Sequence, residues 1–132
     1  MADDQTLSLI VDRIRRALDS EIEFIVLFGS RATGHELPQS DIDIAVKTSL
    51  PEDAWPATQL ELAGLFDPDG QPPVGVVLLD AASLTMQYRV VRDGQVLYSS
   101  DPEHWDRFVE YVLVRYPDWA IYLNRYLEQS LG

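Results

Sequence analysis

The chain has 132 residues, 46% of them hydrophobic, which is enough to form one compact domain with its own core. Its 22 acidic and 10 basic residues give a net charge of −12 without any basic cluster, which argues against direct binding to DNA or RNA. The absence of cysteine excludes disulfides and thiolate metal sites, and two isolated histidines give little basis for a zinc site. An acidic surface instead favours a basic protein partner.

The chain shows neither a signal-peptide pattern nor an apolar run of membrane-spanning length. Its first residues, Met-Ala-Asp-Asp-Gln-Thr, lack the positive charge and the apolar segment of a secretory signal. No apolar stretch approaches the length that crosses a bilayer, so no contact with a membrane is expected. Together with the lack of cysteine, these features predict a cytoplasmic location.

Hydrophobic periodicity divides the first two thirds of the chain into alternating helices and strands. Apolar residues repeat at helical spacing near the N-terminus, and a continuous apolar run then predicts a central strand. Clusters of proline, glycine and aspartate separate the later elements. The predicted helices are residues 6–20, 51–66 (with Pro56 at the true start or at a kink) and 83–92, with one helical turn at 31–34; the predicted strands are residues 23–28, 41–46, 74–79 and 95–98.

The last third of the chain is helical and rich in aromatic residues. Asp101 and Pro102 predict a helix start, and Pro117 separates this helix from a second one at residues 118–131. The first helix is expected to pack on the sheet, whereas one face of the second is suited either to a partner protein or to a second copy of the chain. We therefore predict an α+β fold, a small mixed sheet with helices packed on it, within one domain (residues 1–132) made of an α/β core (1–100) and C-terminal helices (101–132). The packing residues are Trp105, Phe108 and Val112, and the open face carries Trp119, Tyr122, Leu123 and Tyr126.

The segment that carries most of the chemistry follows the first predicted strand. Its residues 24–28 read Phe-Ile-Val-Leu-Phe and are followed by Gly29 and Ser30. A glycine after a strand lets the backbone approach a ligand closely, because glycine has no Cβ atom. If a helical turn begins at Ser30, its backbone N–H groups and the serine hydroxyl can bind phosphate. Gly29 and Ser30 are therefore candidate nucleotide-binding residues, and Arg31 is a candidate phosphate contact because a guanidinium suits phosphate.

Two aspartates, Asp41 and Asp43, open the second predicted strand, with ten residues between Ser30 and Asp41. Side chains alternate along a strand, so both carboxylates should point to one face while residues 42, 44 and 46 point into the core. Magnesium takes oxygen ligands and keeps positions for substrate phosphates, so this pair suits one or two Mg²⁺ ions in a phosphoryl or nucleotidyl transfer. Asp41 and Asp43 are the candidate catalytic residues and metal ligands.

These motifs resemble a known family. The pattern of Gly29-Ser30, ten residues and Asp41-x-Asp43 is similar to the minimal nucleotidyltransferase (MNT) branch of the polymerase-β superfamily, and the likeness covers nearly the whole chain. Short members of this kind resemble MntA-like antitoxins, which are paired with a HEPN-domain ribonuclease toxin. The resemblance implies a polymerase-β-like fold and transfer of AMP from ATP to a toxin tyrosine. It also implies that Gly29 and Ser30 hold the triphosphate and that Asp41 and Asp43 bind Mg²⁺.

Gly75 departs from the family pattern. The family usually has a third carboxylate on a neighbouring strand, and the matching segment reads Val-Gly-Val-Val, so glycine stands at the expected acid. Asp80 lies five residues further on and would face the opposite side of a regular strand, although a bulge or the end of the strand could re-aim it. Two other acidic residues, Asp67 and Asp69, lie on a predicted turn and are weaker substitutes. The chain's only lysine, Lys47, is either a charge at a strand edge or a triphosphate contact.

The sequence leaves three hypotheses for function. The first is a Mg²⁺-dependent nucleotidyltransferase that AMPylates a partner protein. The second is a catalytically degenerate MNT-fold antitoxin that blocks a ribonuclease by binding alone, since glycine replaces the third acid. The third is a small-molecule nucleotidyltransferase, for which the chain has little room to build an acceptor pocket.

Overall fold

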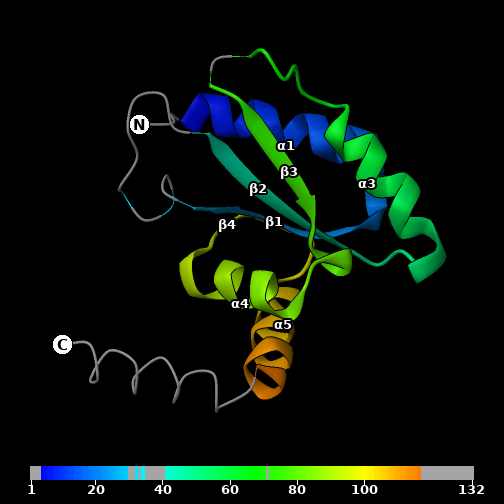
Figure 1. Ribbon diagram of the computed structural model, residues 1–132, viewed down its shortest axis with the longest axis vertical. Helices are drawn as coiled ribbons and strands as arrows, with labels where there is room; N and C mark the ends of the chain where they lie inside the picture. The colour runs from blue at the N-terminus through cyan, green and yellow to red at the C-terminus, as the bar shows by residue number, and fades with distance from the viewer. Residues whose placement is uncertain (1–3, 30–31, 33, 35–40, 71, 117–132) are drawn as a thin grey trace.

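The computed structural model describes residues 4–29, 32, 34, 41–70 and 72–116, and these form a mixed sheet with helices on both faces (Figure 1). The sheet has the strand order β3-β2-β1-β4. Strand β1 pairs antiparallel with β2 and β4, whereas β2 and β3 are parallel. The strands are β1 (Ile22–Phe28), β2 (Ile42–Thr48), β3 (Val74–Leu78) and β4 (Gln95–Ser99). The predicted α+β fold and the central position of β1 are confirmed.

The register of the sheet places Asp43 between two other strands at one end of the molecule. In the antiparallel pair, Phe28 of β1 lies opposite Asp43, and in the parallel pair Gly75 of β3 lies opposite it on the other side. The residue that follows β1, Gly29, therefore lies close to the start of β2. This arrangement brings together three segments that the sequence separates.

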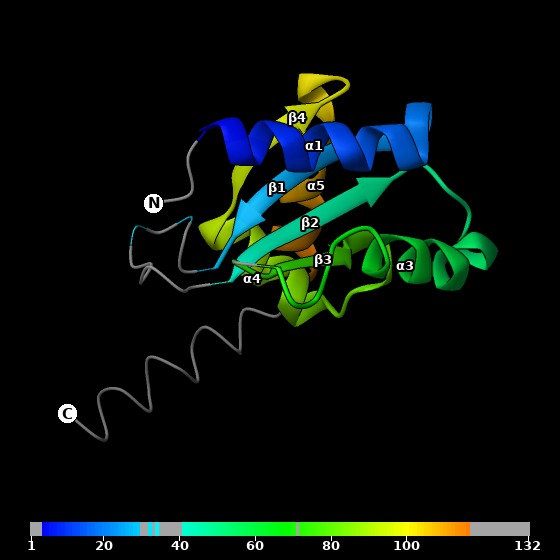
Figure 2. The same cartoon turned by 90° about the horizontal axis from the view of Figure 1, so that it is seen from above.

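Helices α1 (Asp4–Leu18) and α3 (Trp55–Ala63) cover one face of the sheet (Figures 1 and 2). The predicted face of α1 is buried, with the side chain of Ile14 fully excluded from solvent. From the strands, alternate side chains of β2 enter this core, as the period of two predicts. The fully buried residues of β2 on this face are Ile42, Ile44 and Val46. The opposite face of β2 is therefore left to Asp43, Ala45 and Lys47.

Helices α4 (Leu84–Asp93) and α5 (Pro102–Arg115) cover that second face (Figure 1). Phe24 of β1 is fully buried there, and its ring lies 5.2 Å from the ring of Trp105 and 5.4 Å from that of Phe108, measured between centroids. Val112, one turn further along α5, is also fully buried. The predicted packing of the first C-terminal helix on the sheet is confirmed.

Local signals in the sequence begin and end these helices. The Ser83 hydroxyl accepts the N–H of Met86 at 3.1 Å, and the Asp101 carboxylate accepts the N–H of Glu103 at 2.9 Å, so both residues are N-caps. The long helix predicted at residues 51–66 is shorter than expected and lies between a 3₁₀ turn and a loop. Gly94 ends α4 beside β1, where a Cβ atom would lie 2.6 Å from Val26 Cγ1. The 3₁₀ turns are η1 (Asp19–Glu21), η2 (Glu52–Ala54) and η3 (Leu79–Ala81).

Two predictions concern segments that lie outside the described residues. They are the second C-terminal helix at residues 118–131, with its open aromatic face, and most of the helical turn at 31–34. Among the helices that the structure describes, none has the length and apolar character needed to span a membrane.

Candidate active site

The backbone turns sharply at Gly29, directly after β1. Gly29 has a φ of +78°, in the left-handed region, and its carbonyl accepts the N–H of Ala32 at 3.1 Å. A Cβ atom built at this position would overlap Oδ2 of Asp43 and lie 3.3 Å from its Cγ. Both the φ angle and the space therefore require glycine. The predicted proximity of the Gly29 turn and the acidic pair is observed for Asp43.

Asp43 is half-buried on the face of β2 opposite the fully buried Ile42 and Ile44. Asp41 is exposed and immediately precedes the strand. Burial, and secondly the negative charge of Asp41, raise the pKa of Asp43 above its ordinary value, while the charge of Arg89 acts in the opposite direction. The two aspartates are therefore close enough to repel each other, and a cation bound between them would relieve that repulsion. Two carboxylates with open positions fit Mg²⁺, which commonly takes one or two carboxylates together with substrate phosphates.

Gly75 occupies the place predicted for the third carboxylate. It is exposed, it pairs with Asp43 across the parallel strands, and a Cβ atom at this position would lie 3.9 Å from Asp43 Oδ1. A side chain there would thus point toward the acidic pair. Within the described part of the chain, no group of three or more histidine, aspartate or glutamate residues could hold a metal ion. The site described here has two acids and a vacant third position.

Asp80 does not fill that position. It lies in η3, where one carboxylate oxygen accepts the N–H of Thr48 at 2.9 Å and the other accepts the Thr48 hydroxyl at 3.1 Å. Its side chain is only 2% exposed. Thr48 lies five positions beyond Asp43 along β2, so the two residues are roughly 16 Å apart in a strand. The idea that the end of the strand re-aims Asp80 into the site is wrong, because the carboxylate is fixed at the other end of β2.

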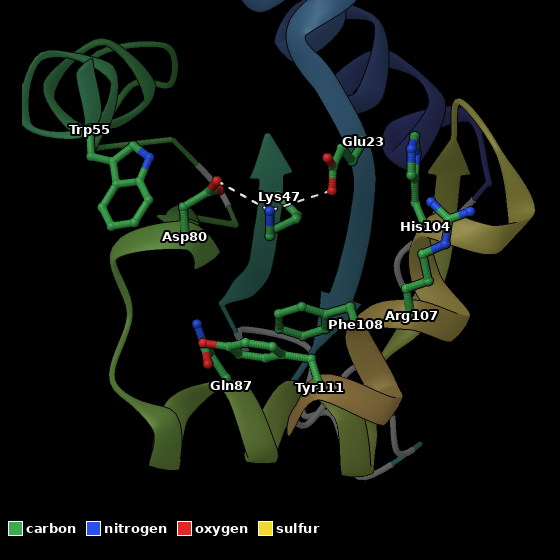
Figure 3. Close-up of a pocket in the computed structure, with 9 residues that line it drawn as sticks. All are labelled: Glu23, Lys47, Trp55, Asp80, Gln87, His104, Arg107, Phe108 and Tyr111. Atoms are coloured by element: carbon green, nitrogen blue, oxygen red, sulfur yellow. Dashed lines mark hydrogen bonds and ion pairs between the residues drawn. The ribbon is translucent and has the colours of Figure 1, made fainter. Parts of the chain in front are cut away.

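Lys47 shares this second location (Figure 3). Its ammonium lies 3.4 Å from a carboxylate oxygen of Asp80 and 3.4 Å from one of Glu23, and it donates to the Thr48 carbonyl at 2.9 Å. The expectation of a charge at a strand edge is wrong in position, since β2 is an inner strand. A triphosphate contact is equally unsupported, since the Lys47 ammonium is bound by these three oxygens.

A cavity of about 440 Å³ opens at the same end of the sheet, between η3, α3 and α5 (Figure 3). Lys47, which lines it, forms ion pairs with two other lining residues, Asp80 and Glu23. Neither the Gly29 turn nor the acidic pair contributes to it, so this cavity is separate from the predicted site. Its other lining residues are Trp55, Gln87, His104, Arg107, Phe108 and Tyr111.

One charged residue at the acidic pair was not predicted from the sequence. Arg89 of α4 places its guanidinium carbon 5.9 Å from the centroid of the Phe28 ring, next to the Gly29 turn, and its charge lowers the pKa of Asp43. Nothing in the local sequence identifies it, because its position depends on how α4 packs across the sheet. Two predicted site residues, Ser30 and Arg31, lie outside the described residues.

Comparisons with known proteins agree with this geometry. Residues 12–103 match the family described as Polymerase beta, Nucleotidyltransferase. The protein adenylyltransferase MntA of Aphanizomenon flos-aquae (strain 2012/KM1/D3) is 32% identical over 101 residues, which are 70% of this chain and 67% of the relative.

Solved structures share the fold. A chain in a toxin–antitoxin crystal structure with AMP-PNP is 24% identical, with a TM-score of 0.63 over 94% of this chain and 98% of that one. A chain in a structure of tri-AMPylated Shewanella oneidensis HEPN toxin with MNT antitoxin is 22% identical, with a TM-score of 0.61 over 97% of this chain and 98% of that one. The resemblance drawn from the Gly-Ser and Asp-x-Asp motifs is thereby confirmed. The chain belongs to the polymerase-β nucleotidyltransferase family, and the MntA-like adenylyltransferases are among its relatives.

Proposed function

We propose that this chain is an MntA-like antitoxin that transfers AMP from ATP to a tyrosine of a HEPN-domain toxin in a Mg²⁺-dependent reaction. The observation that carries the proposal is the Asp43 carboxylate, held against the Gly29 turn and coupled to Asp41. Its 32% identity to a protein adenylyltransferase supports the reaction class. The net charge of −12 suits a ribonuclease partner that is itself basic enough to bind RNA.

In this reaction, Asp41, Asp43 and Gly29 would have different roles. Bound Mg²⁺ would neutralise charge on the phosphates and orient them for attack. Asp41 and Asp43 would hold it, and the raised pKa of Asp43 means that a cation there stabilises the ionised carboxylate. Gly29 would leave room for the triphosphate beside the backbone.

The transfer itself exchanges one phosphorus–oxygen bond for another. The tyrosine oxygen attacks the α-phosphorus of ATP, the bond to the bridging oxygen breaks, and its electron pair leaves with pyrophosphate. The phenolic proton would pass to solvent, because Gly75 stands beside Asp43 where a third carboxylate could accept it. Positioning and charge stabilisation, rather than general base catalysis, would therefore supply most of the rate.

Gly75 favours a second candidate, an antitoxin that has kept the fold and the nucleotide site but blocks the toxin by contact alone. Loss of a general base or of a metal ligand commonly slows a reaction by about a hundredfold to ten-thousandfold. Such a protein would still bind Mg²⁺ and nucleotide through its two remaining acids. The two candidates therefore differ in what happens to the toxin, not in the nucleotide site.

The test is to combine the purified chain with a HEPN-domain protein encoded beside it, Mg²⁺ and ATP, and to weigh the intact partner by mass spectrometry. A mass gain of one or more adenylyl groups that disappears in Asp41→Asn supports transfer. Asp53→Asn is the matched control, because Asp53 is an exposed aspartate of η2, remote from the motif. Loss of ribonuclease activity without any mass gain supports the contact mechanism, and no effect on the partner refutes both.

A further inference from the structure

Helix α4 is fixed across the end of the sheet that holds Asp43. Val90 is fully buried in the same cluster as Phe24 and Phe28. Gln87, also buried, donates its side-chain amide to the Leu79 carbonyl at 3.0 Å. These contacts on both sides of residue 89 hold the helix in place and so determine where Arg89, which is exposed, lies.

Within the described part of the chain, the guanidinium of Arg89 has no hydrogen-bond acceptor. It lies over the face of the Phe28 ring, with 5.9 Å from its carbon to the ring centroid, and no hydrogen bond or ion pair joins it to another described residue. Arg92 on the same helix is different, because its guanidinium makes two hydrogen bonds to the Asp93 carboxylate, at 3.0 and 2.8 Å. Among the described residues, helix α4 therefore carries one arginine that is paired with a carboxylate, Arg92, and one that is not, Arg89.

Arg89 lies near the acidic pair. Its charge and that of Asp41 both act on the Asp43 carboxylate, so the three side chains are close enough to interact. A triphosphate bound with Mg²⁺ beside two aspartates would leave excess negative charge, and a guanidinium binds phosphate oxygens through paired donors. Phe28 directly precedes Gly29 and lies opposite Asp43 in the sheet, so Arg89, at the Phe28 ring, lies on the sheet face that carries Asp43.

We propose that Arg89 binds the outer phosphates of a nucleoside triphosphate, from the α4 side of the site and beside the Gly29 turn. This inference rests on the proposed function. When the bond to the α-phosphorus breaks, negative charge moves onto the departing pyrophosphate, and the guanidinium of Arg89 stabilises that charge. Arg89 would thus discriminate nucleotides by their number of phosphates, whatever the acceptor protein is.

Binding measurements without any toxin test this assignment. Isothermal titration calorimetry with Mg²⁺ compares AMP-PNP and AMP on the wild type, Arg89→Ala, Arg89→Lys and the matched control Arg92→Ala. We expect Arg89→Ala to weaken AMP-PNP binding by about 10- to 100-fold and to leave AMP binding unchanged, with partial recovery in Arg89→Lys. Arg92→Ala should bind both nucleotides as the wild type does, and Tm should change little in Arg89→Ala because the side chain is exposed.

The outcomes separate the two proposals. If the wild type fails to bind Mg²⁺ and AMP-PNP, the nucleotide site itself is refuted and the role of Arg89 falls with it. If the wild type binds but Arg89→Ala binds AMP-PNP equally well, or loses AMP in the same proportion, only the role of Arg89 is overturned. A loss confined to AMP-PNP supports it.

Discussion

Replacing Gly29 with alanine perturbs the site where β1 ends against the Asp43 carboxylate. Two independent costs follow from the structure. The φ of +78° places the new residue in the left-handed region, which costs an L-residue roughly 1–2 kcal/mol. The new Cβ atom also overlaps Oδ2 of Asp43, so that the carboxylate must move, at a cost of about 1–3 kcal/mol by analogy with overpacking. We expect Gly29→Ala to lower the free energy of unfolding by about 3 kcal/mol.

Gly34 provides a matched control within the same chain. Its φ is +79°, but a Cβ atom at this position would have no atom of the described residues within 4 Å. Gly34→Ala should therefore show only the backbone cost, roughly 1–2 kcal/mol. Urea denaturation of both variants gives the two free energies of unfolding, and the excess in Gly29→Ala measures the contact with Asp43.

A double-mutant cycle identifies the partner of the new methyl group. Asp43→Ala removes the carboxylate and keeps only its Cβ atom, which would lie at an ordinary 3.5 Å from the Cβ of alanine 29. In the Asp43→Ala background, Gly29→Ala should thus cost no more than Gly34→Ala does. If the excess cost of Gly29→Ala persists without the carboxylate, or if both glycine variants lose the same stability, Asp43 does not lie against the turn and the site geometry is wrong.

Three further predictions concern Asp43 and Asp80, near the two ends of β2, and the position of the missing third carboxylate at Gly75. Because the folded state holds the Asp43 proton more tightly than the unfolded chain does, the contribution of Asp43 to the free energy of unfolding should fall as pH rises from about 3.9 through the raised folded pKa. Asp43→Asn should become more stable than the wild type over that pH range and keep this advantage at neutral pH. A difference in the free energy of unfolding between variant and wild type that stays constant with pH, measured by urea denaturation, would contradict this. Asp80→Ala should lower the free energy of unfolding by roughly 2–4 kcal/mol, because it removes the buried partner of Thr48 and Lys47. The Kd for Mg²⁺ and AMP-PNP should stay unchanged, and weaker nucleotide binding in this variant would show that Asp80 belongs to the site. Gly75→Asp should place a third carboxylate beside Asp43 and raise the rate of AMP transfer by about a hundredfold, and an unchanged rate in single-turnover assays would mean that the third acid is not what limits the enzyme.

The location of the acidic pair could be predicted because it depends on the strand period alone. Residues 42, 44 and 46 are apolar, so the aspartates between and before them had to lie on the other face. The helix caps at Ser83 and Asp101 were equally local, since each depends on a few neighbouring residues. In these places the pattern within one element decides the structure.

The roles of Asp80, Lys47 and Arg89 could not be predicted because each depends on contacts between elements. Strand β2 continues to Thr48, two residues beyond the predicted end, and this extension brings its last residue to the η3 turn that carries Asp80. Lys47 therefore lies inside an inner strand between two carboxylates. Arg89 reaches Phe28 only through the packing of α4 on the second face. Strand register and helix packing depend on the whole fold, so no local sequence pattern predicts them.

Asp43 and Asp80, near opposite ends of β2, differ in how far the fold compensates their charge. Asp80 is almost completely buried, and its carboxylate has hydrogen bonds and an ion pair that compensate its lost hydration. Asp43 is half-buried, and its burial and the charge of Asp41 raise its pKa, while the charge of Arg89 offsets this rise only in part. A buried charge that the fold already satisfies gains little from a cation, whereas one that the fold compensates only in part gains more. A cation bound at Asp43 would therefore recover the free energy that its partial burial costs, so this end of β2 is better suited to a metal–nucleotide complex than the Asp80 end.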